Sequence, residues 1–195
     1  LSGSPEFAAK TLCNVAQEAN ECRLYSLQLE WTQRAVELSP ADARAYGHLA
    51  DALISLHRFE EALGALEEIE RIGDDRFANT ERARILRLQG RLYEALTAFD
   101  TIKQTYGTDP GNKFAWNGYA EVLRDMWRFD QALIAYDAAI AKYPDDNVSK
   151  CGRAAVLTQL GRLAEAQGAF ENILQKDQQN EIALCGNGHV LRQMG

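Results

Sequence analysis

Apolar residues recur along the chain with the spacing of one face of an α-helix. In one typical segment the small Ala62 is followed by Leu66 and then by Ile69. Offsets of three, four and seven residues place side chains on a single helical stripe. The pattern predicts helices over residues 9–22, 24–38, 43–56, 58–72, 76–89, 91–106, 113–126, 128–142, 147–160, 162–176 and 181–194.

These helices repeat in pairs about every 34 residues. The anchoring alanines are spaced by 33, 37 and 34 residues, at Ala62, Ala95, Ala132 and Ala166. Twelve residues before each anchor stands a second alanine: Ala50, Ala83, Ala120 and Ala154. Paired alanines let two helix backbones approach closely, so each repeat is predicted to be a helical hairpin. Gly90 and Gly161 are expected to have positive φ in the hairpin turns.

The segment from Ala35 to Tyr46, running on to Leu49 and Ala50, resembles a junction between two tetratricopeptide repeats. The resemblance covers residues 9–195 and implies an all-α fold, a right-handed α-solenoid of antiparallel helical hairpins. We expect five hairpins plus one extra helix, in units over residues 9–42, 43–75, 76–112, 113–146, 147–180 and, in part, 181–195. The first unit departs most, because Gln28 stands where the others carry the anchoring alanine.

The two ends of the chain look unlike the repeats. Residues 1–8 resemble the scar of an expression tag and a linker, so we leave them out of the array. The helix over 181–194 lacks both a second helix and the polar face of a terminal cap. We therefore expect the natural protein to continue past Gly195, and the chain to be a fragment.

Composition narrows the classes of function. The formal net charge of −7 argues against nucleic-acid binding, which draws its affinity from lysine and arginine. No apolar run approaches the roughly 18 residues of a membrane span, which argues against membrane insertion. The four cysteines lack C-x-x-C spacing and are interpreted as reduced thiols, which predicts a cytoplasmic location.

The resemblance also implies a binding site, because tetratricopeptide arrays line a concave groove with the first helix of each hairpin. Equivalent positions of the first helices then form stripes along that groove. One stripe is mostly apolar and either packs on the preceding hairpin or forms an exposed hydrophobic lip. Its members are Arg44, Phe77, Phe114, Val148 and Ile182.

Two further stripes are charged. In the first, alternating signs favour a row of structural salt bridges; its members are Asp51, Arg84, Glu121, Ala155 and His189. The second holds neighbouring arginines, in the order Asn20, Ile54, Arg87, Arg124, Thr158 and Arg192. The arginines either bind an acidic peptide or are neutralised internally, with Glu121 or Asp125 as the counter-ion.

The fourth stripe consists of small residues. Gly118, Gly152 and Gly186 occupy one position in three successive first helices and follow Asn117, Cys151 and Cys185. Glycine within a helix costs about 1 kcal/mol relative to alanine, so something is expected to approach the backbone closely. That neighbour is either a bound partner lying on a smooth groove floor or a tightly packed helix of the array itself.

Candidate chemistry is sparse. Cys151, Cys185 and His189 offer zinc-type donors, but helical cysteines are mostly small buried residues, so we predict no metal and no cofactor. A clamp for a terminal carboxylate is disfavoured, because Glu81 and Gly118 stand where that clamp needs basic residues. No catalytic arrangement of nucleophile and base appears, and we predict that the chain is not an enzyme.

The sequence thus favours a scaffold that binds a peptide or partner protein, acidic if the arginines recruit it. One alternative is self-association through the uncapped last helix. Another is a regulatory or substrate-docking region of a multidomain enzyme.

Overall fold

The computed structural model describes residues 4–107 and 109–195, and every regular element in these ranges is helical. The chain divides into two compact units, one ending at Ile85 and the other beginning at Leu86. The predicted all-helical class and the pairing of consecutive helices are confirmed.

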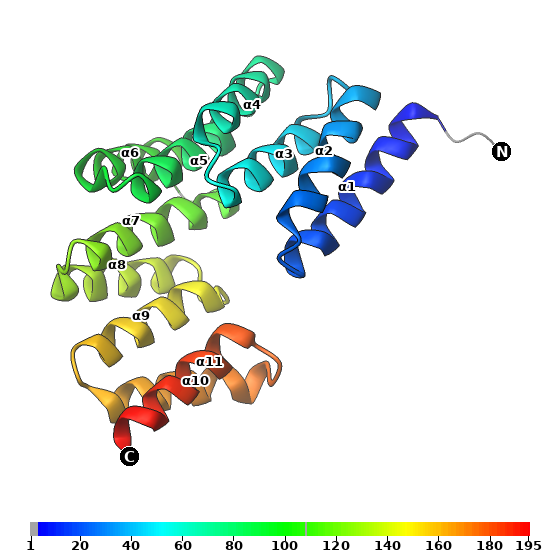
Figure 1. Cartoon of the computed structure of the whole chain (residues 1–195). Helices are drawn as coiled ribbons and strands as arrows, with labels where there is room; N and C mark the ends of the chain where they lie inside the picture. The colour runs from blue at the N-terminus through cyan, green and yellow to red at the C-terminus, as the bar shows by residue number, and fades with distance from the viewer. Residues whose placement is uncertain (1–3, 108) are drawn as a thin grey trace. The chain divides into compact units, whose positions relative to one another are not determined.

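The first unit contains two complete hairpins and most of a fifth helix (Figure 1). α1 packs on α2 and α3 on α4, while α2 and the first helix α1 also contact α3. The helices are α1 (Pro5–Glu21), α2 (Tyr25–Leu38), α3 (Ala43–Ser55), α4 (Phe59–Ile72) and α5 (Asp75–Leu88), whose last residues belong to the second unit.

The second unit stacks a second helix, two hairpins and a final first helix (Figure 1). Each helix packs on the next, and the first helices α7, α9 and α11 also contact one another in sequence. The elements are α6 (Leu92–Tyr106), the 3₁₀-helix η1 (Pro110–Asn112), α7 (Lys113–Asp125), α8 (Phe129–Lys142), α9 (Asn147–Gln159), α10 (Leu163–Lys176) and α11 (Glu181–Met194).

The repeat alanines have the structural role that their spacing predicts. Every anchoring alanine is fully buried, as is its partner twelve residues earlier. Gly90 and Gly161 have φ values of 76° and 73°, which confirms the predicted left-handed turn position. Arg23, His57 and Trp127 occupy the same turn position with φ near 60°. A side chain there costs roughly 1–2 kcal/mol, which packing of the hairpins must offset.

The start of α1 is the boundary that differs most from the prediction. α1 begins at Pro5, four residues before the predicted start of the array, because the Ser4 hydroxyl accepts a hydrogen bond from the Phe7 amide at 3.3 Å. The short 3₁₀-helix η1, which the periodicity did not predict, precedes α7, and there the Asp109 carboxylate accepts a hydrogen bond from the Gly111 amide at 2.8 Å.

In the first hairpin the polar residue Gln28 occupies the position of the anchoring alanine. Gln28 is fully buried, and its amide nitrogen lies 3.5 Å from the His48 carbonyl oxygen. The same nitrogen lies 3.4 Å from the Asp51 carboxylate. A buried amide with such partners replaces the alanine without leaving its nitrogen unpaired.

Candidate functional site

The first helices of the second unit lie side by side, α7 against α9 and α9 against α11. Among the described residues the second helices α6, α8 and α10 have no contacts of similar extent with one another. When one layer of a helical stack is closer together than the other, the stack curves toward the closer layer. The first helices therefore form the inner layer of this unit, and the predicted binding residues from Phe114 to Arg192 lie on them.

The glycine stripe lies against aromatic rings of the protein itself. A Cβ atom built on Gly118 would come within 2.4 Å of the Phe99 ring. A Cβ atom built on Gly152 would lie 2.4 Å from the Tyr136 ring, and one built on Gly186 would lie 2.4 Å from the Phe170 ring. Each ring comes from the second helix of the preceding hairpin and is almost fully buried. The packing interpretation of these glycines is therefore confirmed, and they give no support to a groove floor.

Asn117 and Cys151 are likewise engaged inside the array. Asn117 is buried, and its amide nitrogen donates to Asp146, the N-cap of α9, at 2.8 Å. Its carbonyl oxygen accepts from the Ser149 hydroxyl. Cys151 makes the equivalent contact with Asn180, the N-cap of α11, at 3.9 Å. The prediction that Asn117 and Cys151 face a partner is not supported, because both join one first helix to the next.

Burial, reinforced by Asp146, raises the pKa of the Cys151 thiol to about 11, so it stays protonated at neutral pH. A zinc ligand must be a thiolate, so this environment disfavours metal binding at Cys151. Cys185 and His189 are exposed on α11, and His189 lies within 2.8 Å of Arg192. Within residues 4–107 and 109–195, no three His, Cys, Asp or Glu side chains gather closely enough to hold a metal ion.

Arg87 and Arg124, the neighbouring arginines of the predicted stripe, are neutralised by carboxylates of the first helix α7. The Arg87 guanidinium lies 2.9 Å from Glu121 and 3.0 Å from Asp125, and its side chain is only 19% exposed. Arg124 also pairs with Asp125, at 3.4 Å. The stripe was predicted either to bind an acidic peptide or to be neutralised internally, and the structure shows internal ion pairs at Arg87 and Arg124. An acidic partner therefore gains no free arginine at Arg87.

In the first unit the salt-bridge row is confirmed at Arg84, which lies 2.9 Å from Asp51 and 3.0 Å from Glu81. Burial raises the pKa of Glu81, although Arg84 opposes that shift. Arg44 is exposed and pairs with Asp42 at 3.8 Å. The Phe77 ring packs on Gly47, with 3.5 Å to a constructed Cβ, so this member of the apolar stripe belongs to the core.

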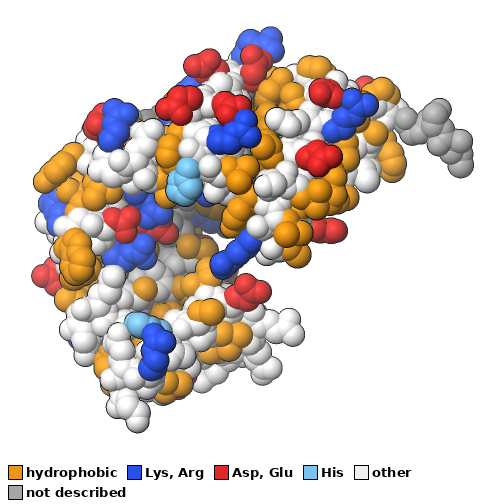
Figure 2. Space-filling model, in the orientation of Figure 1, with side chains coloured by type: hydrophobic (Ala, Val, Ile, Leu, Met, Phe, Trp, Pro, Cys, Tyr) orange, Lys and Arg blue, Asp and Glu red, His pale blue; other side chains and the backbone are white. Residues whose placement is uncertain are grey.

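The other members of the apolar stripe are exposed. Phe114, Val148 and Ile182 have 58%, 44% and 57% of their surface accessible. They occupy equivalent positions near the starts of α7, α9 and α11, and we call them the apolar lip. Figure 2 shows hydrophobic groups around α9 and α11 with a histidine and a basic side chain among them, whereas acidic and basic side chains intermingle more densely around α4. Exposed apolar groups rimmed by polar atoms are typical of interaction surfaces.

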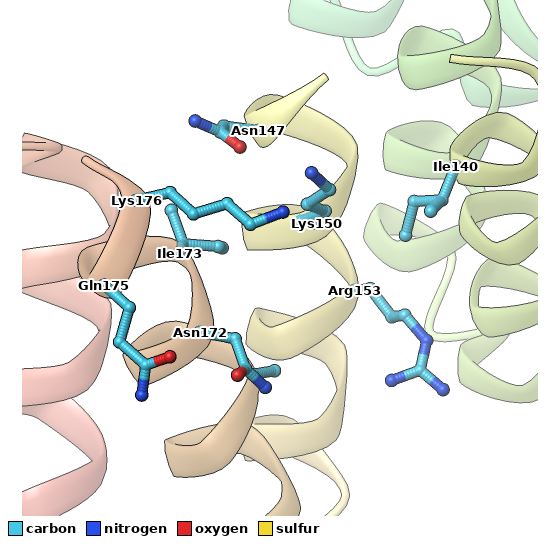
Figure 3. Close-up of a pocket in the computed structure, with 9 residues that line it drawn as sticks. Ile140, Asn147, Lys150, Arg153, Asn172, Ile173, Gln175 and Lys176 are labelled. Carbon is cyan, nitrogen blue, oxygen red and sulfur yellow. The ribbon is translucent and has the colours of Figure 1, made fainter. Parts of the chain in front are cut away.

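A pocket of about 340 Å³ lies between α8, α9 and α10, outside the predicted stripes. Lys150 and Lys176 line it together with amide and aliphatic side chains (Figure 3). Sequence reasoning missed this pocket. Its residues come from three helices and share no repeat position, so no periodic signal marks them.

No helix in the described residues combines the length and apolar character needed to cross a bilayer. A comparison with curated protein sequences finds no match. Solved structures with the same fold include the thermophilic protein TTC0263 of Thermus thermophilus, with 18% identity, a TM-score of 0.73 and coverage of 94% of this chain and 99% of that one.

Two further structures are similar. PilF of Pseudomonas aeruginosa has 14% identity and a TM-score of 0.63, with 98% of this chain and 86% of that chain covered. YrrB, described as having an unusual peptide-binding site, has 16% identity and a TM-score of 0.55, with 91% and 90% covered. The sequence model of the tetratricopeptide repeat matches residues 29–77 and 119–181, more than half of the chain. The chain therefore belongs to the tetratricopeptide repeat family.

Proposed function

We propose that the protein is a binding scaffold that holds an apolar or amphipathic segment of a partner protein against the apolar lip. The observation that carries this proposal is the exposure of Phe114, Val148 and Ile182 on three adjacent first helices. Full burial of such a side chain contributes about 1.5–3 kcal/mol, and since about half of each is exposed, a partner that covers them recovers roughly half of that amount for each.

The charges of the inner layer favour an apolar partner over an acidic one. Arg87 and Arg124 are held by Glu121 and Asp125, so an incoming carboxylate has to displace an existing pair. A cation beside the lip is Lys113, whose ammonium lies 5.3 Å from the centre of the Phe114 ring. A partner therefore meets aliphatic and aromatic surface first, with this cation at its edge.

A displayed peptide library selected on the purified protein provides a probe. The dissociation constant of a selected peptide is then measured with Phe114→Asp and Val148→Asp. We expect a loss of at least about tenfold for each, since removing one apolar anchor costs about 1.4 kcal/mol or more. Circular dichroism should stay unchanged, because both side chains are exposed.

Ile134 supplies the matched control. It is 70% exposed but lies on the second helix α8, in the outer layer. Ile134→Asp should leave the affinity unchanged. Equal losses in all three variants, or a loss in Ile134→Asp alone, would place binding elsewhere and contradict the proposal.

Self-association through α11 is a second candidate. Leu184, Leu191 and Met194 are 49%, 48% and 49% exposed on this helix. A second copy of the chain can cover them in a symmetric interface. Sedimentation equilibrium of the protein and of Leu184→Glu/Leu191→Glu tests this: dimers that the double variant abolishes support self-association, and a monomer at all concentrations excludes it.

A further inference from the structure

We infer that the pocket between α8, α9 and α10 binds a phosphomonoester group through Lys150 and Lys176. This site lies apart from the apolar lip and does not depend on the function proposed there. Asn147, Lys150 and Arg153 line it from α9 at three-residue spacing, a different stripe of the helix from Val148 and Gly152.

The two lysines are cations without a counter-ion. In the described parts of the chain neither ammonium has an ion pair, although most arginines of the same unit are paired within 4 Å. Figure 3 shows the Lys176 side chain reaching from α10 toward α9, where Lys150 lies. Two like charges directed at one space repel each other unless an anion lies between them.

The carboxylates next to the pocket residues make their contacts with other groups of the protein. Asp137 holds the Arg153 guanidinium at 2.6 Å, and Figure 3 shows Arg153 directed away from the lysines. Asp146 accepts hydrogen bonds from Ser149 and Asn117. Asp177, next to Lys176, accepts from the Asn180 side chain at 3.0 Å. No carboxylate is among the residues that line the pocket within the described chain.

The chemistry of the lining favours phosphate over carboxylate. Lysine binds as a compact point charge with three rotatable donors and is a common phosphate ligand, and two lysines side by side suit a doubly charged anion better than a singly charged carboxylate. Two ammonium groups match the charge of a phosphate dianion, and the amides of Asn172 and Gln175 add hydrogen-bond donors.

The pocket is also larger than the phosphate alone requires. At about 340 Å³ it lies at the lower end of the range for small-molecule sites. Ile140 and Ile173 supply aliphatic surface for the organic part of the ligand. The same chemistry is available from a free phosphomonoester and from a phosphorylated side chain of a peptide.

The test is an NMR titration of the ¹⁵N-labelled full chain with O-phosphoserine, and with acetate at matched ionic strength. We expect saturable shifts of α9 and α10 amides with O-phosphoserine and none with acetate. Lys150→Met/Lys176→Met should weaken binding by about tenfold or more. Lys10→Met, which removes an exposed lysine from α1, should bind like the unmodified chain.

The double variant is expected to fold, because it removes two unpaired like charges, and its thermal unfolding curve checks this directly. A phosphoserine peptide and its unphosphorylated form complete the series. Tighter binding of the phosphopeptide than of free O-phosphoserine identifies a protein ligand, and equal or weaker binding identifies a small molecule. Unchanged binding by the double variant, equal shifts with acetate, or shifts scattered over lysines outside the pocket would overturn the inference.

Discussion

Two stripes on the same three helices of the second unit have opposite environments. Gly118, Gly152 and Gly186 lie against buried rings of the preceding hairpins, whereas the apolar lip, one helical turn earlier, faces solvent. Both stripes recur with the repeat, and both look unusual in the sequence. The difference teaches that recurrence of a residue type in the repeat does not by itself distinguish a packing position from a binding position. The two are distinguished by whether the space around the residue is filled by the protein or open to solvent.

The packing role of the glycine stripe is tested most sharply by adding a side chain to one of its glycines. Gly152→Ala should lower the free energy of unfolding by about 1–3 kcal/mol, because its Cβ meets the buried Tyr136 ring. The control is Gly168→Ala on α10, where a constructed Cβ has no neighbour within 4 Å. That variant should gain up to about 1 kcal/mol from helix propensity. Urea unfolding of both proteins measures the difference, and a stabilised Gly152→Ala would refute the packing role.

A second prediction concerns the arginines of the inner layer. Arg87→Glu brings a third carboxylate beside Glu121 and Asp125 and should cost about 1–2 kcal/mol of stability in urea unfolding. Arg34→Glu on α2 is the control, since its pair with Glu37 is 63% exposed on both sides and contributes little. If Arg87→Glu unfolds at the same urea concentration as the control, the arginine is free for a partner after all.

The hydrogen bonds of Asp146, which join α7 to α9, predict that stability depends on pH. Burial by itself raises the pKa of Asp146, but hydrogen bonds from Ser149 and Asn117 lower it overall. A lowered pKa in the folded state means that the stabilisation is present above the ordinary value of 3.8 and is lost as pH falls through the folded value.

Asp146→Asn should therefore cost about 0.5–2 kcal/mol near neutral pH, because asparagine still caps the helix but lacks the charge that strengthens the hydrogen bonds from Ser149 and Asn117. The cost should shrink below pH 3.8. Unfolding curves at a series of pH values measure this; a cost that stays constant with pH would mean that the charge of Asp146 contributes nothing.

The smallest expected effect is at the ring that covers Gly152. The Tyr136 hydroxyl is buried without a hydrogen-bond partner in the described chain, and Phe170 occupies the equivalent place one repeat later. Tyr136→Phe should leave the packing intact and raise stability by about 1 kcal/mol or less, because an unpaired buried hydroxyl is removed. A clear loss of stability in thermal unfolding would indicate a partner for that hydroxyl.

Much of the fold could be predicted from the sequence, because the repeat alanines and turn glycines act locally. The binding site was harder to predict from the sequence than the fold, as Phe77 and Phe114 illustrate. Both occupy the same repeat position, yet Phe77 packs on Gly47 while Phe114 is exposed.

In the hairpins of the second unit the residues matching Gly47 are Asn117 and Cys151, and each is covered by the N-cap of the following first helix. Such contacts join residues about thirty positions apart. Helical periodicity carries no information about such contacts. For the same reason the sequence left open whether Arg87 is neutralised within the protein or free to bind a partner.

The most direct test of the account is a map of backbone amide shifts when a selected peptide binds to the ¹⁵N-labelled protein. We predict that the largest shifts fall at the starts of α7, α9 and α11, around Phe114, Val148 and Ile182. Amides near Gly118, Gly152 and Gly186 should shift less, because their neighbours are rings of the protein itself. Shifts centred on the second helices α8 and α10, with the apolar lip unaffected, would contradict the account.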